Sequence, residues 1–162
     1  MLIRAFALLA REFPDWKVRL LGKDTTKYAK ACRKEIARLG VGNQVDIVGF
    51  TNDLAGEYSR AAFIAFPSRL EGFPLAILEA AKYALPTLAT SNLPGVTDIV
   101  RSDETGLVVP RTVPAFTAGL RKLMTDVAYR EALGLVSRDY CAAHYSRARI
   151  LDRWESLLSA CR

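Results

Sequence analysis

Apolar and polar residues alternate along this chain with two periods, one typical of helices and one typical of strands. Apolar residues that recur every three or four positions predict helices over residues 2–13, 26–39, 53–61, 74–83, 95–100, 113–124, 127–142 and 145–160. Shorter apolar or alternating runs predict strands over residues 17–22, 44–50, 62–68, 86–90 and 106–110. Strands that alternate with helices indicate an α/β fold, a Rossmann-like parallel sheet with helices on both faces. The run at 62–68 is apolar enough to predict a strand buried on both faces.

The front of the chain departs from that layout. Met1 leads straight into the first predicted helix, whereas a doubly wound unit normally opens with a strand. We therefore expect the first strand of the sheet to be missing. A chain of 162 residues predicts one domain that buries roughly 70% of its unfolded surface. That domain covers residues 1–162 and ends in a helix at about 145–160, whose apolar stripe predicts a docking face.

The net charge of the chain excludes few classes of partner. The chain carries 23 Lys and Arg against 17 Asp and Glu, a net charge of +6. Aromatic residues are not interleaved with the basic ones, which favours a solvated surface over a nucleic-acid site. We expect no nucleic-acid partner. Attraction to an anionic membrane surface or to a phosphorylated substrate fits the same excess of positive charge.

Cysteine, histidine and hydropathy narrow the class of protein. Cys32, Cys141 and Cys161 are odd in number and form no C-x-x-C pair, which is typical of a reduced protein. The only histidine, His144, argues against a His-built metal site. No run approaches the ~20 apolar residues of a membrane span. We expect a cytoplasmic protein, with peripheral contact at the inner face of the membrane as a further expectation.

Three predicted loops are the candidates for ligand binding. Ligands of parallel sheets bind beyond the carboxyl ends of the strands, against the N-termini of the helices that follow. These ends fall at residues 49–52, 68–75 and 90–95. The functional residues are therefore expected there before any family is considered.

The segment RLEGFPLAILEAAKYALPTLAT, residues 69–90, carries two acids eight positions apart, Glu71 and Glu79. Gly72 lets the backbone approach a ligand closely. The first N–H groups of the helix that begins near Pro74 suit a phosphate. Glu71 lies in the loop, where its carboxylate could accept hydrogen bonds from sugar hydroxyls. Glu79 lies inside the helix and needs donors, which the two hydroxyls of a ribose would supply.

The two glutamates also have a purely structural interpretation. In that interpretation Glu71 is solvated, and Glu79 pairs with Lys82 or with a backbone N–H. Two glutamates at this spacing are a weak signal, so the spacing alone does not decide between the interpretations.

A wider segment, residues 67–110, resembles the donor site of a known family. It reads PSRLEGFPLAILEAAKYALPTLATSNLPGVTDIVRSDETGLVVP, in which a strand ends in Pro-Ser, the loop E-G-F-P-L follows, and a second glutamate completes E-x7-E. This pattern is similar to the group 1, family 4 retaining glycosyltransferases of the GT-B fold. The similarity extends from about residue 2 to residue 158. It implies that the chain is the half of a GT-B fold that binds a nucleotide sugar.

The resemblance also implies roles for individual residues. Glu71 would be the catalytic residue at the donor sugar, and Glu79 would bind the ribose. The other substrate-binding residues would be Gly49, Phe50 and Thr51 beside the base, Ser68, Gly72, Phe73, Pro74 and Leu75 at the sugar and diphosphate, and Gly95 in the third loop. No cofactor and no metal are implied, because helix N-termini and basic side chains hold the leaving phosphate.

The chain departs from the family pattern in several places. A loop with an Arg and a Lys that grip the diphosphate, and an N-terminal domain that binds the acceptor, would both precede Met1. A missing N-terminal domain or a partner chain is therefore an expected partner. Pro94 and Gly95 stand where Gly-Gly is common, which removes one backbone donor. Ala84 replaces a usual glycine, at a cost of ~1 kcal/mol if its backbone is left-handed.

Three functions remain as alternatives. The first is the donor half of a glycosyltransferase that transfers a hexose. The second is a non-catalytic module that binds a nucleotide sugar and acts through a partner chain. The third is one half of a nucleotide-sugar epimerase, against which the E-x7-E pattern argues.

Overall fold

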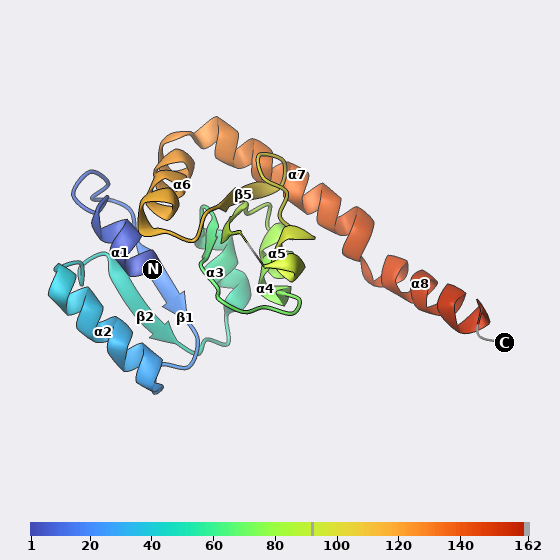
Figure 1. Cartoon of the computed structure of the whole chain (residues 1–162), viewed down its shortest axis with the longest axis horizontal. Coiled ribbons are helices and arrows are strands. Elements are labelled where there is room, and N and C mark those ends of the chain that lie inside the picture. Colours follow the sequence, from blue (N-terminus) through green and yellow to red (C-terminus); the bar gives the residue numbers. More distant parts are fainter. Residues whose placement is uncertain (92, 161–162) are drawn as a thin grey trace.

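The computed structural model describes residues 1–91 and 93–160, and strands and helices alternate along them as predicted (Figure 1). The helices are α1 (Leu2–Ala7), α2 (Lys27–Leu39), α3 (Leu54–Arg60), α4 (Leu75–Ala81), α5 (Pro94–Thr97), α6 (Val113–Thr125), α7 (Val127–Tyr145) and α8 (Arg147–Ala160). The strands are β1 (Val18–Leu21), β2 (Val45–Gly49), β3 (Ile64–Phe66), β4 (Thr87–Thr90) and β5 (Gly106–Val109). Asn92, in the third predicted loop, and Cys161 lie outside the described residues.

The first helix is shorter than predicted. It ends at Ala7, and residues 8–12 form turns in which the Leu9 N–H donates to the Phe6 carbonyl at 2.8 Å. Leu9 and Ala10 are nevertheless buried. Leu9 and Ala10 were predicted to be helical because they are apolar at helical spacing. The turns at residues 8–12 bury them equally well, so their burial does not depend on a continuous helix.

Two further helix boundaries differ from the prediction. Pro74 is the residue before α4 rather than its first helical residue, with ψ of 91°. The last helix begins at Arg147 rather than at residue 145, because Ser146 adopts an extended backbone with ψ of 153° and breaks the path from α7.

The strands form two parallel sheets rather than the single sheet predicted. β1 pairs with β2, and β3, β4 and β5 form the second sheet in that order. Both sheets are parallel, with Val18 opposite Val45 in the first and Ile64 opposite Thr87 in the second. The α/β fold with helices flanking parallel strands is confirmed, and the described residues place no strand between β1 and β3.

This division changes the environment of β3. The central strand β4 is buried at all four of its residues, whereas all three residues of β3 are only partly buried. The prediction of a strand buried on both faces at 62–68 is therefore wrong. Among the described residues β3 pairs with β4 alone, so its other edge has no neighbouring strand there.

Two apolar clusters hold the helices to the strands. One joins Phe6 of α1, Phe116 of α6 and Leu88 of β4. The other joins Ile77 of α4 and Ala89 of β4, together with residues of α5 and α7. Leu88 and Ala89 are consecutive in one strand, so their side chains point to opposite faces. Helices α1 and α6 thus cover one face of the sheet, and α4, α5 and α7 cover the other.

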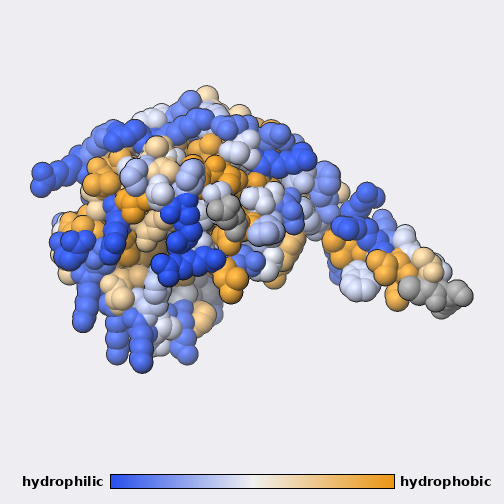
Figure 2. Space-filling model, viewed as in Figure 1, coloured by the Kyte–Doolittle hydropathy of each residue, from blue (hydrophilic) through white to orange (hydrophobic). Residues whose placement is uncertain are grey.

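Helix α8 extends away from the rest of the molecule (Figure 1). None of its described residues is buried, and Leu151, Trp154, Leu157 and Leu158 are exposed (Figure 2). The chain exposes 9951 Å², more than the roughly 8,000 Å² expected of a folded monomer of 17.9 kDa. The projecting helix and the open strand edges both contribute to this additional accessible surface. Each described helix is too short or too polar to cross a membrane.

Candidate functional site

The loop after β3 and the start of α5 meet at the carboxyl ends of the strands. A Cβ atom added to Gly95 would lie 1.7 Å from the Gly72 carbonyl oxygen, so only a glycine fits there. Gly72 itself has no neighbour within 4 Å of its own Cβ position and faces open space. The structure therefore brings two of the three predicted loops together, with Gly72 on the open side.

Ser68 organises the start of this loop. Its hydroxyl donates to Oε1 of Glu71 at 2.9 Å. Its carbonyl accepts from the Thr90 hydroxyl and from Nε of Arg111, both at 3.3 Å. Glu71 is partly buried, and its Oε2 has no partner among the described residues. One oxygen of this carboxylate is thus held, and the other is available to a ligand.

Glu79 has a different partner from any expected. Its Oε2 accepts a hydrogen bond of 3.0 Å from the Tyr58 hydroxyl of α3, and the described residues show no ion pair with Lys82. The Tyr58 ring stacks on Tyr83 at a centroid distance of 5.5 Å. Burial and the nearby Glu79 carboxylate raise the pKa of Tyr58 to about 12, so the hydroxyl keeps its proton.

Phe73, Pro74 and Leu75 differ in how far they reach solvent. Pro74 is buried, so its ring serves packing. Phe73 is half-exposed and contacts the Tyr145 ring at the end of α7, at a centroid distance of 5.5 Å. Leu75 is 63% exposed at the first position of α4. Phe73 is therefore held in place, whereas Leu75 projects toward solvent.

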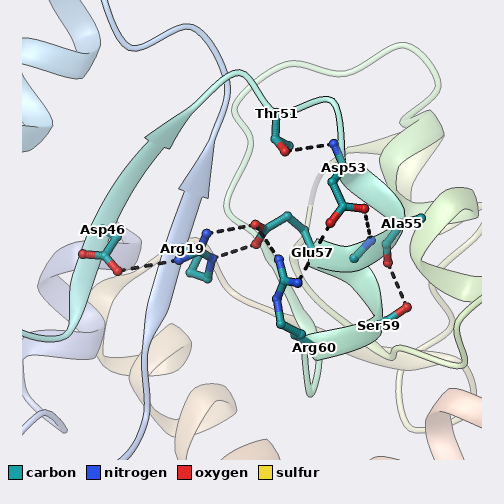
Figure 3. Close-up of polar contacts among 9 residues, drawn as sticks. Arg19, Asp46, Thr51, Asp53, Ala55, Glu57, Ser59 and Arg60 are labelled. Atoms are coloured by element: carbon teal, nitrogen blue, oxygen red, sulfur yellow. Dashed lines mark hydrogen bonds and ion pairs between the residues drawn. The ribbon is translucent and has the colours of Figure 1, made fainter.

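The loop after β2 forms a separate group. Gly49 has φ of +82°, in the left-handed region, and its Cβ position faces the Asp24 carboxylate at 3.6 Å. Thr51 accepts a hydrogen bond of 3.0 Å from the Asp53 N–H, which fixes the turn into α3 (Figure 3). Phe50 is 80% exposed. No hydrogen bond joins this loop to Glu71 or Gly72 within the part of the chain that the structure describes.

Sequence reasoning missed Tyr58 and Arg111. Arg111 follows β5, and the rule that selected the other strand ends would also have selected this one. Tyr58 gave no such signal, because it lies inside a helix and 21 positions from Glu79. Both residues place a donor group beside a predicted site residue.

These loops are exposed at the strand ends, since the Cβ position of Gly72 meets nothing within 4 Å and Leu75 is 63% exposed. Two depressions, of about 450 and 300 Å³, lie along α8 and beside α2 and β2. Neither is lined by Glu71, Glu79 or Gly95.

Comparison with known proteins identifies the family. The model of the family described as glycosyl transferases group 1 matches residues 1–139. The chain belongs to this family. It is 26% identical over 159 residues to an uncharacterized glycosyltransferase of Haemophilus influenzae, which covers 97% of this chain and 44% of that protein. The chain thus spans less than half the length of that relative.

Solved structures show the same fold. Anabaena Alr3699/HepE in complex with UDP and glucose matches with a TM-score of 0.87 and 21% identity, over 99% of this chain and 44% of that one. The C-terminal domain of a glycosyl transferase group 1 family protein, LpcC from Francisella tularensis, matches with a TM-score of 0.78 and 25% identity. That match covers 90% of this chain and 78% of the other. The fold described here is one half of the GT-B fold.

Proposed function

We propose that this chain is the donor-binding domain of a retaining glycosyltransferase that transfers a hexose from a nucleoside diphosphate. The observation that carries the proposal is the arrangement of two carboxylates, Glu71 on the loop that contacts Gly95 and Glu79 on the helix α4 that follows this loop. In each carboxylate one oxygen is held by a protein hydroxyl. The second oxygen of each has no partner among the described residues, which suits it to accept from a ligand hydroxyl.

The proposed roles follow from position. Glu79 accepts hydrogen bonds from the ribose hydroxyls, and Glu71 acts at the donor sugar. The backbone of Gly72 approaches the diphosphate, because no Cβ stands in the way. Arg111 beside Ser68 supplies positive charge to the leaving phosphate, a role that needs no metal ion. The loop with Gly49, Phe50 and Thr51 lines the base.

We further propose that the acceptor is bound by polypeptide outside residues 1–162, either an N-terminal domain or a partner chain. The support is the exposure of the site loops and the greater length of the Haemophilus relative. Without that additional polypeptide the acceptor has no binding site that positions it for the reaction. The isolated chain is expected to form no glycoside, and a turnover of ~1 per second would contradict this.

A binding titration tests the two glutamates separately. UDP and UDP-glucose at millimolar concentration are the probes, followed by calorimetry or ligand-observed NMR. Glu79→Ala should weaken both probes by about ten- to a hundredfold, since a hydrogen bond to a charged group is worth roughly 1.5–3 kcal/mol. Glu71→Ala should leave UDP unchanged and remove only the increment that the sugar adds.

Lys82→Ala is the matched control. Lys82 is an exposed charged residue at the end of α4 that should not contact the ligand. Its replacement should change neither affinity. Equal losses for both probes at Glu71, or none at Glu79, would return the two glutamates to their structural interpretation.

A further inference from the structure

The loop of residues 68–75, the donor loop, is held at its aromatic residue by the end of a distant helix. Phe73 lies between Gly72 and Pro74, and its ring meets the Tyr145 ring at a centroid distance of 5.5 Å and an interplanar angle of 56°. This geometry is typical of aromatic pairs that attract one another. Tyr145 is the last residue of α7. The contact therefore joins the donor loop to a helix that lies far along the chain.

Tyr145 is itself fixed on two sides. Its ring packs against the apolar cluster that contains Ile77 and Val96, and its hydroxyl donates to the Asp98 carbonyl at 2.9 Å. Asp98 ends α5, and the last carbonyls of a helix have no donor within that helix. Burial raises the pKa of Tyr145, so the hydroxyl keeps its proton and can donate at neutral pH. The orientation of the Tyr145 ring is therefore set by α5 and α7.

Helix α5 also meets the donor loop at its other end. A Cβ atom on Gly95, in the first turn of α5, would clash with the Gly72 oxygen and lie 3.5 Å from Cα of Phe73. The same short helix ends at Asp98, which accepts from Tyr145. A closed set of contacts thus holds the loop: the start of α5 meets its backbone, and the tyrosine anchored at the end of α5 meets its aromatic ring.

The two proposed ligand-binding carboxylates are oriented from different directions. Glu71 lies in the donor loop, where the Ser68 hydroxyl holds one of its oxygens. Glu79 lies on α4 and is held by Tyr58 of α3. No hydrogen bond joins Tyr145 to either glutamate among the residues that the structure describes. Loss of the Tyr145 ring should therefore release the donor loop and leave the surroundings of Glu79 unchanged.

We propose that Tyr145 is a positioning residue of the donor site, which acts through Phe73 to hold the donor loop where the sugar and the diphosphate bind. In this role it contacts neither the sugar nor the phosphates. A loop that is fixed before binding loses less conformational freedom when the ligand arrives, so the contact raises affinity for the parts of the ligand that the loop meets. The inference rests on the proposed function, since it assigns a further residue to the same site.

Three nucleotide probes separate the donor loop from the rest of the site. UMP carries the base, the ribose and one phosphate, UDP adds the second phosphate, and UDP-glucose adds the sugar. Each is titrated at millimolar concentration against the whole chain by ligand-observed NMR. Tyr145→Leu removes the ring contact and should weaken UDP-glucose by at least about tenfold and UMP by less than about threefold, with UDP between them. A variant that only lost stability would weaken all three probes by the same factor.

Two further variants distinguish the ring of Tyr145 from its hydroxyl. Tyr145→Phe keeps the ring against Phe73, and the Tyr140 hydroxyl still donates to the Asp98 carbonyl, at 3.3 Å. This variant should therefore retain its affinity for all three probes within about threefold. Tyr140→Phe removes the other hydroxyl and leaves the contact between Tyr145 and Phe73 in place. It is the matched control and should change none of the three affinities.

A double-mutant cycle on UDP-glucose completes the test. Phe73→Leu removes the same contact from a half-exposed residue and should give the same pattern, so the test does not depend on the stability of Tyr145→Leu alone. If the two residues act through one contact, the double variant should bind UDP-glucose no more weakly than the weaker-binding single variant. Additive losses, equal losses of all three probes in Tyr145→Leu, or an unchanged affinity for UDP-glucose would overturn the inference alone. Failure of the unsubstituted chain to bind any probe would overturn the proposed function, and the role of Tyr145 with it.

Discussion

The Tyr58 hydroxyl on α3 donates a hydrogen bond of 3.0 Å to Oε2 of Glu79 on α4. The carboxylate proposed to hold the ribose is therefore oriented by a neighbouring helix. Stacking of Tyr58 on Tyr83 fixes the donor ring in turn. Tyr83, Tyr58 and Glu79 are thus connected by one stacking contact and one hydrogen bond. Substitutions of these residues can be compared by their effect on nucleotide affinity.

Removal of the Tyr58 hydroxyl should weaken nucleotide binding. Tyr58→Phe keeps the ring stack but leaves Glu79 without its donor, so the carboxylate is less well oriented. We expect UDP affinity to fall by about five- to tenfold, as for the loss of one hydrogen bond of roughly 1–1.5 kcal/mol. Tyr83→Phe is the control, because the Tyr83 hydroxyl makes no hydrogen bond with the described residues. Equal affinities of the two variants would show that Tyr58 does not position Glu79.

The pKa of Tyr58 predicts a pH dependence. Burial first, and then the hydrogen bond to Glu79, raise this pKa from 10.0 to about 12. The folded state therefore binds the proton more tightly than the unfolded state. The resulting stabilisation is complete below pH 10 and is lost as pH rises from 10 to about 12. In an ultraviolet titration of the six tyrosines, Tyr58→Phe should remove a component that titrates near pH 12. Loss of a component near pH 10 would contradict the assignment.

The sequence predicted the parts of the site that follow from local rules. Loops at the carboxyl ends of strands require only the alternation of strands and helices, and Ser68, Glu71, Gly72 and Gly95 do lie together. The contact between Tyr58 and Glu79 depends on the rotation of two short helices about their axes. No local pattern encodes that rotation, so the structure was needed to find it.

The two sheets were unpredictable for a similar reason. The strands β1 to β5 were each recognisable from their own residues. Whether β1 and β3 pair depends on whether another strand separates them, which is a property of the whole arrangement. The partial burial of Ile64 and Phe66 follows from the same cause.

Ala84 is a site where a substitution should stabilise the fold. Its φ is +53°, in the left-handed region that disfavours a Cβ. Ala84→Gly should raise the free energy of unfolding by ~1 kcal/mol, measured by urea denaturation. Lys82→Gly is the control. Lys82 has φ of −58°, so glycine there should be neutral or destabilise by about 0.5–1 kcal/mol. A loss of stability in Ala84→Gly would contradict the strain inferred here.

Thr87 carries a buried hydroxyl whose Oγ1 has no hydrogen-bond partner among the residues that the structure describes. Thr87→Val replaces that hydroxyl with a methyl group of similar shape. The free energy of unfolding should stay equal or rise by about 1 kcal/mol, because the cost of an unpaired polar group disappears. Thr90→Val should instead destabilise, since the Thr90 hydroxyl donates to Ser68. Marked destabilisation in Thr87→Val would indicate a partner for the hydroxyl.

The contact between Gly95 and Gly72 should be the most sensitive point of the site. In Gly95→Ala the new Cβ would lie 1.7 Å from the Gly72 oxygen and 2.8 Å from the Gly72 carbonyl carbon. Backbone atoms cannot rotate away as a side chain does, so α5 and the loop must separate. We expect a loss of about 1–3 kcal/mol in the free energy of unfolding, as for overpacking. A loss of stability would point to the steric contact, because helix propensity alone predicts that alanine in place of glycine stabilises a helix.

The separation of α5 from the loop in Gly95→Ala should also weaken ligand binding. Ser68 and Glu71 lie on the loop that must move, so Gly95→Ala should weaken UDP-glucose by more than tenfold if that loop binds the donor. Gly72→Ala is the matched variant. Its Cβ meets nothing within 4 Å, so stability should be unchanged, and only the close approach of a ligand should be blocked. Calorimetry and urea denaturation on both variants separate the two effects. Unchanged affinity in Gly72→Ala would show that no ligand approaches the backbone there, and unchanged stability in Gly95→Ala would show that the loop and α5 do not need their present contact.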